Sequence, residues 1–190
     1  MKITSILLLA LISLTRTVLA ADYELTEHNI KWTGSMPSQT HYGLLTPSTF
    51  EIDIDDSGKV EKLHVVLDMN SLNVTDLKEG KMRNKLTKHL LSDDFLNAKG
   101  YPTSEFELSS HDSGKLVGTI TIRGIEKDIA LPVEVTGDAS NGWILEGSFD
   151  FDRQDFGVSY QNSGFLGAAK DKLIRDLVTM DIRLVVEPKS

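Results

Sequence analysis

The chain has 190 residues, a formal net charge of −8 at pH 7 and no cysteine. This acidic balance disfavours nucleic acids and anionic membranes as electrostatic partners. The lack of cysteine excludes disulfides, thiol catalysis, cysteine-ligated zinc and iron–sulfur clusters.

The first 20 residues have the pattern of a secretory signal peptide. Lys2 provides a positive start, residues 6–14 are apolar, and a run of small and apolar residues ends at Ala20. The apolar run is about half of the roughly 20 residues that a membrane span needs. We therefore expect cleavage after Ala20, no stable membrane anchor, a bacterial periplasmic location and one domain over residues 21–190.

Most of that domain alternates apolar and polar residues, as strands with one buried face do. Residues 34–43 and 157–169 are expected to be loops, and Gly-containing turns separate the other segments. Pro132 removes a backbone donor, so its strand is expected to have a free edge or a bulge there. The expected strands are 23–32, 48–55, 62–69, 105–109, 115–124, 128–135, 143–151 and 178–187.

The stretch from Asp68 to Phe106 departs from this period. Met82, Leu86 and Leu90 recur every four residues and predict one apolar face of a helix, which we expect to point at the sheet. The three lysines at positions 81, 85 and 88 should then face solvent.

Eight strands joined mostly by short turns favour antiparallel pairing, in an up-and-down barrel or a sandwich. A barrel is preferred because closure removes both sheet edges. Its interior has two interpretations on periodicity alone: a solid core, or a cavity lined for a small ligand.

No catalytic or metal motif stands out in the sequence. The five histidines have no metal-ligand spacing, and no GxSxG occurs. Residues 53–58 resemble the opening of an EF-hand loop, but His64 occupies the position of the bidentate acid, so a hairpin turn is the better interpretation. We expect no cofactor and no metal.

Several stretches resemble the YceI-like family of periplasmic lipid-binding proteins. They are VVLDMNSLNVTD, KLTKHLLSDDFLNAKGYPTSEFEL, GTITIRGIEKDIALPVEV and FDRQDFGVSYQNSGFLGAAKDKLIRDLVTMDIRLVV. The resemblance covers most of residues 21–190 in order, whereas the N-terminal part is less typical. It implies an all-β, lipocalin-like, extended antiparallel eight-stranded barrel with a small helical insertion between Asp68 and Phe106.

The resemblance also favours the cavity over the solid core. Tyr101 occupies a motif position, and Arg153 and Asp155 are expected to form an ion pair or cap at a strand end, with head-group contact as the alternative role. The apolar residues expected to line the pocket are Phe50, Leu67, Met69, Met82, Leu86, Leu90, Phe95, Phe106, Ile122, Phe149, Phe151, Phe156 and Phe165.

The function implied is that of a periplasmic carrier for an amphiphilic lipid, such as a quinone-like polyisoprenoid or a fatty amide, with a role in stress response. Two alternatives stay open: a small-barrel isomerase or hydrolase, and a stress-related partner protein without a ligand. A homodimer is also left open.

Overall fold

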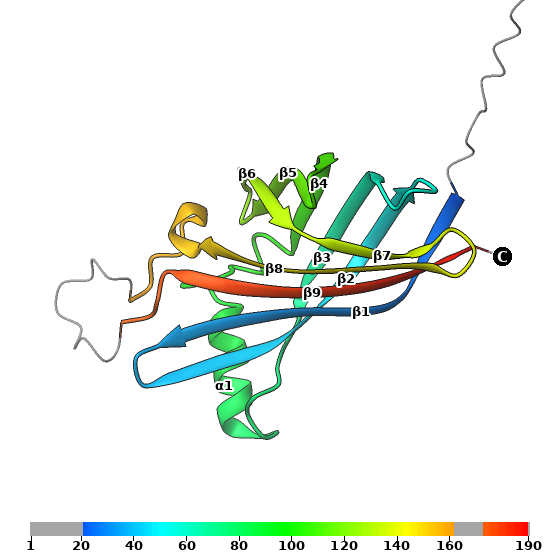
Figure 1. The fold of residues 1–190 in the computed structure, drawn as a ribbon. Coiled ribbons are helices and arrows are strands. Elements are labelled where there is room, and N and C mark those ends of the chain that lie inside the picture. Colours follow the sequence, from blue (N-terminus) through cyan, green and yellow to red (C-terminus); the bar gives the residue numbers. More distant parts are fainter. Residues whose placement is uncertain (1–20, 162–172, 190) are drawn as a thin grey trace, which may run out of the picture.

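A computed structural model describes residues 21–161 and 173–189 (Figure 1). Ala20, with the expected signal peptide, and Phe165 lie outside these residues. Along the described chain the elements are β1 Ala21–Met36, β2 Gln39–Ile54, β3 Val60–Val74, α1 Lys81–Leu90, β4 Thr103–Asp112, β5 Lys115–Ile122, β6 Ile125–Pro132, β7 Glu134–Asp138, β8 Gly142–Asp152, the 3-10 helix η1 Arg153–Phe156, and β9 Leu177–Pro188.

All strand pairs are antiparallel and belong to one sheet in the order β6-β5-β4-β3-β2-β1-β9-β8-β7. Strands consecutive in sequence pair with each other, except that β6 and β7 do not pair and instead form the two ends of the sheet. β9 also returns to pair with β1. In Figure 1 β8 and β9 cross in front of β2 and β3, so the sheet is strongly curled, and α1 lies below it. This confirms the expected antiparallel barrel class with one small helix.

The curled sheet has nine strands rather than eight, because the expected strand 128–135 is divided at Pro132. β6 ends there and pairs with β5, whereas β7 begins two residues later and pairs with β8. The two edge strands are thus joined through Val133 alone. A Cβ at Gly147 of β8 would lie 2.3 Å from the Pro132 carbonyl oxygen, so the two edges approach closely at this step.

Residues 34–43, expected as a loop, instead form the paired ends of β1 and β2. Thr33 pairs with Tyr42 and Gly34 with His41, and a two-residue turn joins the strands. The prediction was wrong because Gly, Ser and Gln are poor strand formers, yet pairing with a neighbouring strand overrides so weak a local preference. The expected turn at residues 53–58 does join β2 and β3.

One end of the barrel is solid. Trp143 is buried there, and its indole Nε1 donates a hydrogen bond to the Tyr23 hydroxyl at 3.0 Å. Val60 and Val186 are also almost completely inaccessible to solvent, and neither lines a cavity. The solid-core interpretation therefore holds at this end, which anchors the rest of the barrel.

Candidate ligand-binding cavity

The barrel contains a cavity of about 390 Å³ on the side of α1. Its walls come from the β1–β2 hairpin, the second half of α1, the segment after η1 and the residues before β9. Most of the side chains that line it are apolar, among them Trp32, Met36, Leu45, Leu72, Leu96, Val158, Ile174, Val178 and Met180. A second cavity of about 110 Å³ shares Leu67, Ser104, Phe151 and Met180 with the first, so the two are adjacent.

Most residues expected to line a pocket do border one of these two cavities. Phe106 and Phe149 border the smaller one. The larger one is bordered by Leu67, Met69, Leu86, Leu90, Phe95, Ile122, Phe151 and Phe156. That any of them touches a ligand stays a prediction.

Two expected apolar residues lie elsewhere. Phe50 packs against the core but lines neither cavity. The expectation that Met82 faces the sheet is wrong, because its side chain is 67% exposed. It sits in the first turn of α1, and α1 packs mainly against β3 through its later residues Leu86 and Leu90. The lysines at 81, 85 and 88 are exposed as expected.

Some cavity residues were missed from the sequence. Trp32, His41 and Leu45 line the cavity from β1 and β2. His41 lies within the region mistaken for a loop, and Trp32 and Leu45 lie just outside it. A usable signal was present, since Gln39, His41, Gly43 and Leu45 continue a period of two toward one face. Trp32 lies over Gly43, and its Nε1 is buried without a hydrogen-bond partner among the described residues.

Arg153 is the most deeply buried charged side chain of the described residues, at 3% exposed, and it lines the cavity. Its guanidinium donates to the backbone carbonyls of Val158, Tyr160, Ile174 and Arg175 at 2.9–3.3 Å, and to the Asp176 carboxylate at 3.2 Å. Burial lowers the pKa of the Arg153 guanidinium, and the nearby charge of Asp176 opposes that fall.

The expected pairing of Arg153 with Asp155 does not form. Asp155 is exposed and pairs with Lys127, at 3.8 Å. The cap at this strand end comes instead from Asp152, whose side chain accepts from the Gln154 backbone N–H at 2.8 Å. Arg153 instead has Asp176 and backbone carbonyls as partners, and these contacts join the chain on the two sides of residues 162–172. Contact of Arg153 with a ligand head group stays a prediction.

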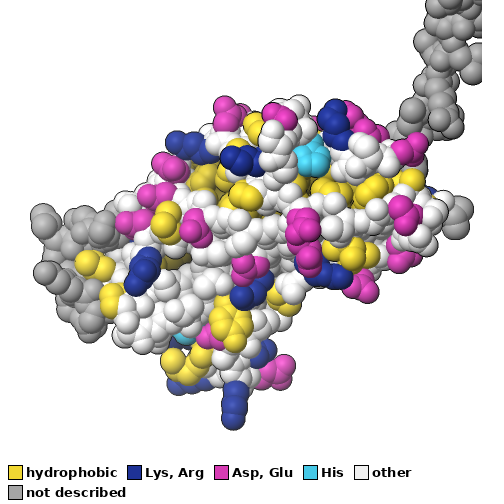
Figure 2. All heavy atoms as spheres, viewed as in Figure 1, with side chains coloured by type: hydrophobic (Ala, Val, Ile, Leu, Met, Phe, Trp, Pro, Cys, Tyr) yellow, Lys and Arg dark blue, Asp and Glu magenta, His cyan; other side chains and the backbone are white. Residues whose placement is uncertain are grey.

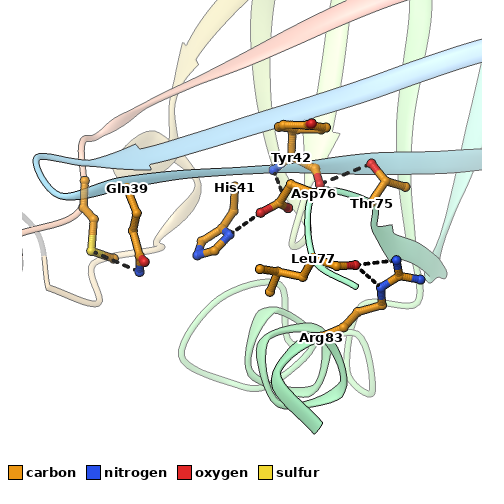
Figure 3. A network of polar contacts seen from close by, with 8 residues as sticks. Gln39, His41, Tyr42, Thr75, Asp76, Leu77 and Arg83 are labelled. Carbon is orange, nitrogen blue, oxygen red and sulfur yellow. Dashed lines mark hydrogen bonds and ion pairs between the residues drawn. The ribbon is translucent and has the colours of Figure 1, made fainter. Parts of the chain in front are cut away.

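A second polar network connects β2 to the segment before α1 (Figure 3). His41 Nδ1 lies 2.7 Å from Asp76 Oδ2, and Asp76 Oδ1 accepts from the Tyr42 backbone N–H at 3.1 Å. The Arg83 guanidinium of α1 donates to the Leu77 carbonyl. These contacts hold α1 beside the cavity from outside, and they place a histidine–carboxylate pair at its wall.

Aromatic side chains form part of the cavity wall near the end of α1. The His89 ring meets Phe95 and Tyr160 edge-on, with centroids 5.0 and 4.8 Å apart. His89 Nε2 also lies 3.1 Å from the Asp94 carboxylate. Together with Arg175, which also lines the cavity, these side chains offer polar groups in a mainly apolar wall.

Within the described residues one group has metal-ligand geometry, and it is on the outer face of the sheet. Potential ligand atoms of His64, Glu105 and Glu107 all lie within 4.8 Å of one another. His64 Nε2 is 2.6 Å from Glu105 and 3.8 Å from Glu107, and Glu107 also interacts electrostatically with Lys62. The contacts of His64 with Glu105 and Glu107 explain why these three side chains lie close together without a metal ion.

A family model for the YceI-like domain matches residues 21–186, which is nearly all of the described chain. The chain belongs to the YceI-like family. This YceI-like chain is 28% identical over 107 residues to a UPF0312 protein of Pseudomonas aeruginosa, and it spans about half the length of that relative. It is also 28% identical over 140 residues to a UPF0312 protein of Shewanella denitrificans, covering 67% of this chain and 68% of the relative.

Solved structures share the fold of this YceI-like chain. BcnA of Burkholderia cenocepacia matches with a TM-score of 0.65 at 18% identity, covering 83% of this chain and 95% of BcnA. A domain of Saccharophagus degradans described as polyisoprenoid binding matches with a TM-score of 0.64 at 13% identity, covering 90% and 99%. In the described ranges 21–161 and 173–189, no helix has the length and apolarity to cross a membrane.

Proposed function

We propose that this YceI-like protein binds one amphiphilic lipid, such as an isoprenoid quinone or a fatty amide, and carries it in the periplasm. The cavity supports this proposal, because its volume of about 390 Å³ falls within the range of small-molecule sites and its wall is mainly apolar. The description of the Saccharophagus degradans domain as polyisoprenoid binding supports the same ligand class.

The driving force for such binding is burial of the apolar tail. Each methylene removed from water contributes roughly 0.8 kcal/mol, so a tail of about ten carbons offsets much of the entropy lost on association. The adjacent smaller cavity offers a continuation for the tail. The polar groups at His89, Tyr160 and Arg175 would then contact the head group.

The two tryptophans allow a direct test, since Trp32 lines the cavity and Trp143 lies in the solid end. Trp143→Phe leaves Trp32 as the sole reporter, and Trp32→Phe leaves Trp143. We expect decylubiquinone to quench Trp32 emission saturably and Trp143 emission much less. Equal, unsaturable quenching of both would overturn the proposal.

Ligand identity and location need separate measurements. Organic-solvent extraction of the protein from a native host, followed by mass spectrometry, should yield a lipid in near-stoichiometric amount. N-terminal sequencing of the exported protein should begin at Ala21. A protein that carries no lipid and takes up none would favour the ligand-free partner hypothesis.

The enzyme alternative has one specific observation in its favour, the His41–Asp76 pair at the cavity wall. A general base of this kind would change the bound lipid chemically. We expect extracted lipid to be recovered unaltered after incubation with the wild-type protein. Conversion that is lost in His41→Ala would support an isomerase or hydrolase instead.

A further inference from the structure

α1 and the turn before it form a basic surface on an acidic protein. Residues 78–90 contain five Lys or Arg side chains and a single acid, Glu79, within a chain whose net charge is −8. Glu79 lies 3.8 Å from Arg83. The other four cations are exposed and form no ion pair with any described residue: Lys78, Lys81, Lys85 and Lys88.

The helix presents these charges in one direction. Lys81, Lys85 and Lys88 are spaced i, i+4 and i+7, so they share one face of α1. The exposed Met82 lies about 100° around the helix from Lys81, between the lysines and the side of α1 where Leu86 and Leu90 pack toward the core. Figure 1 shows α1 standing off the sheet, and in Figure 2 dark blue and yellow side chains gather over this projection.

We propose that α1 docks the protein on an anionic lipid surface, with the three lysines at the head groups and Met82 entering the interface. A basic helix with an exposed apolar side chain is typical of membrane-surface binding. An acidic protein partner would pair with the three lysines but would give no role to the exposed Met82. The Met82 side chain, exposed beside them, favours a bilayer.

The position of the helix also favours a bilayer. Leu86, His89 and Leu90 of α1 line the large cavity, so docking through the opposite face brings the cavity wall next to the lipid surface. The acidic remainder of the protein opposes this contact weakly, because at physiological salt charges farther than about 8 Å through solvent are largely screened. The local charge of α1 therefore decides the interaction.

Vesicle flotation tests the proposal with the delipidated protein, residues 21–190, so it does not depend on the lipid-carrier function. We expect binding to phosphatidylcholine vesicles containing 30% phosphatidylglycerol, little binding to pure phosphatidylcholine, and release in 0.5 M NaCl. Each lysine near an anionic surface contributes about fivefold to partitioning. Lys81→Gln, Lys85→Gln and Lys88→Gln together should weaken binding about a hundredfold.

The matched control removes the same charge elsewhere, through Lys59→Gln, Lys115→Gln and Lys127→Gln together. This variant should lose only a few-fold in vesicle binding. A loss as large as that of the α1 variant, or equal wild-type binding to neutral and anionic vesicles, would overturn the proposal. Circular dichroism checks folding, and quinone quenching of Trp32 in the α1 variant should be unchanged, which separates docking from lipid binding.

Discussion

Arg153 provides the sharpest test of how the cavity is held in shape. Its guanidinium has donor contacts with four backbone carbonyls and one carboxylate while being 3% exposed. Replacing Arg153 with Met keeps similar length but removes all of these hydrogen bonds. It also leaves the partly buried carboxylate of Asp176 without this cation.

Removal of one partner from a buried ion pair costs about 3–5 kcal/mol. We therefore expect Arg153→Met to lower the free energy of unfolding by that amount, and Arg153→Lys to lower it by about 1–3 kcal/mol, because a lysine keeps the charge but not the planar fork. Urea denaturation followed by tryptophan fluorescence measures both. Quinone binding should weaken as well, since Arg153 fixes the chain around the cavity.

Asp155→Asn serves as the control. The side chain is exposed and its contact with Lys127 is 3.8 Å long, so this change should stay within about 0.5 kcal/mol of wild type. If Arg153→Met lowered the free energy of unfolding by less than about 1 kcal/mol, or if Asp155→Asn lowered it equally, Arg153 would not be the residue that holds these segments together.

Three further predictions concern packing and pH. Leu86→Asp puts a charge where α1 packs on the core, so it should lower the free energy of unfolding by about 2–3 kcal/mol and reduce lipid uptake. Met82→Asp, at an exposed position of the same helix, should change the free energy of unfolding by less than about 0.5 kcal/mol. Urea titrations of the two variants measure this difference. Gly43→Ala should lower the free energy of unfolding by about 3 kcal/mol or more, because the new Cβ would lie 1.8 Å from the Asn73 carbonyl oxygen. At Gly34 a new Cβ would have no atom within 4 Å, so Gly34→Ala should be close to neutral in the same assay. Hydrogen bonds from Ser140 and Asn141 lower the pKa of Asp138, and one from the Ser57 hydroxyl lowers that of Asp55. A carboxyl group whose pKa is lowered by folding stabilises the folded state at pH values above its unfolded-state pKa of about 3.9, and this stabilisation is lost as the pH falls further. The melting temperature should therefore decrease as the pH is lowered below about 4, and it should decrease less steeply in Asp138→Asn. Identical dependence of the melting temperature on pH in the two proteins would contradict this reasoning.

The barrel was predictable from the sequence because one face of each strand is buried. Alternation at Ile52, Leu63 and Val65 identifies inward positions without any knowledge of their partners. The ends of β1 and β2 could not be found this way. Their polar and Gly-rich residues take strand geometry from pairing with each other, which local propensity does not encode.

The site was predictable only in part. Helical spacing placed Leu86 and Leu90 toward the cavity, but it could not show that the first turn of α1, with Met82, has no surface to pack on. Three partners of Arg153, namely Ile174, Arg175 and Asp176, come from a segment about 20 residues away in sequence, so no local pattern reveals them. The net negative charge of the whole chain likewise gave no indication that α1 carries a basic surface.

The pairing of β1 with β9 bears on how the chain acquires its fold. The first described strand lies in the middle of the sheet, and one of its two edges is filled only by the last strand, with Tyr23 opposite Pro188. Until β9 arrives, β1 exposes a long row of unpaired backbone groups, and Val186 does not yet cover the solid end. Folding must therefore wait for this most distant contact in the sequence, and an emerging or truncated chain would be vulnerable to strand addition from another molecule.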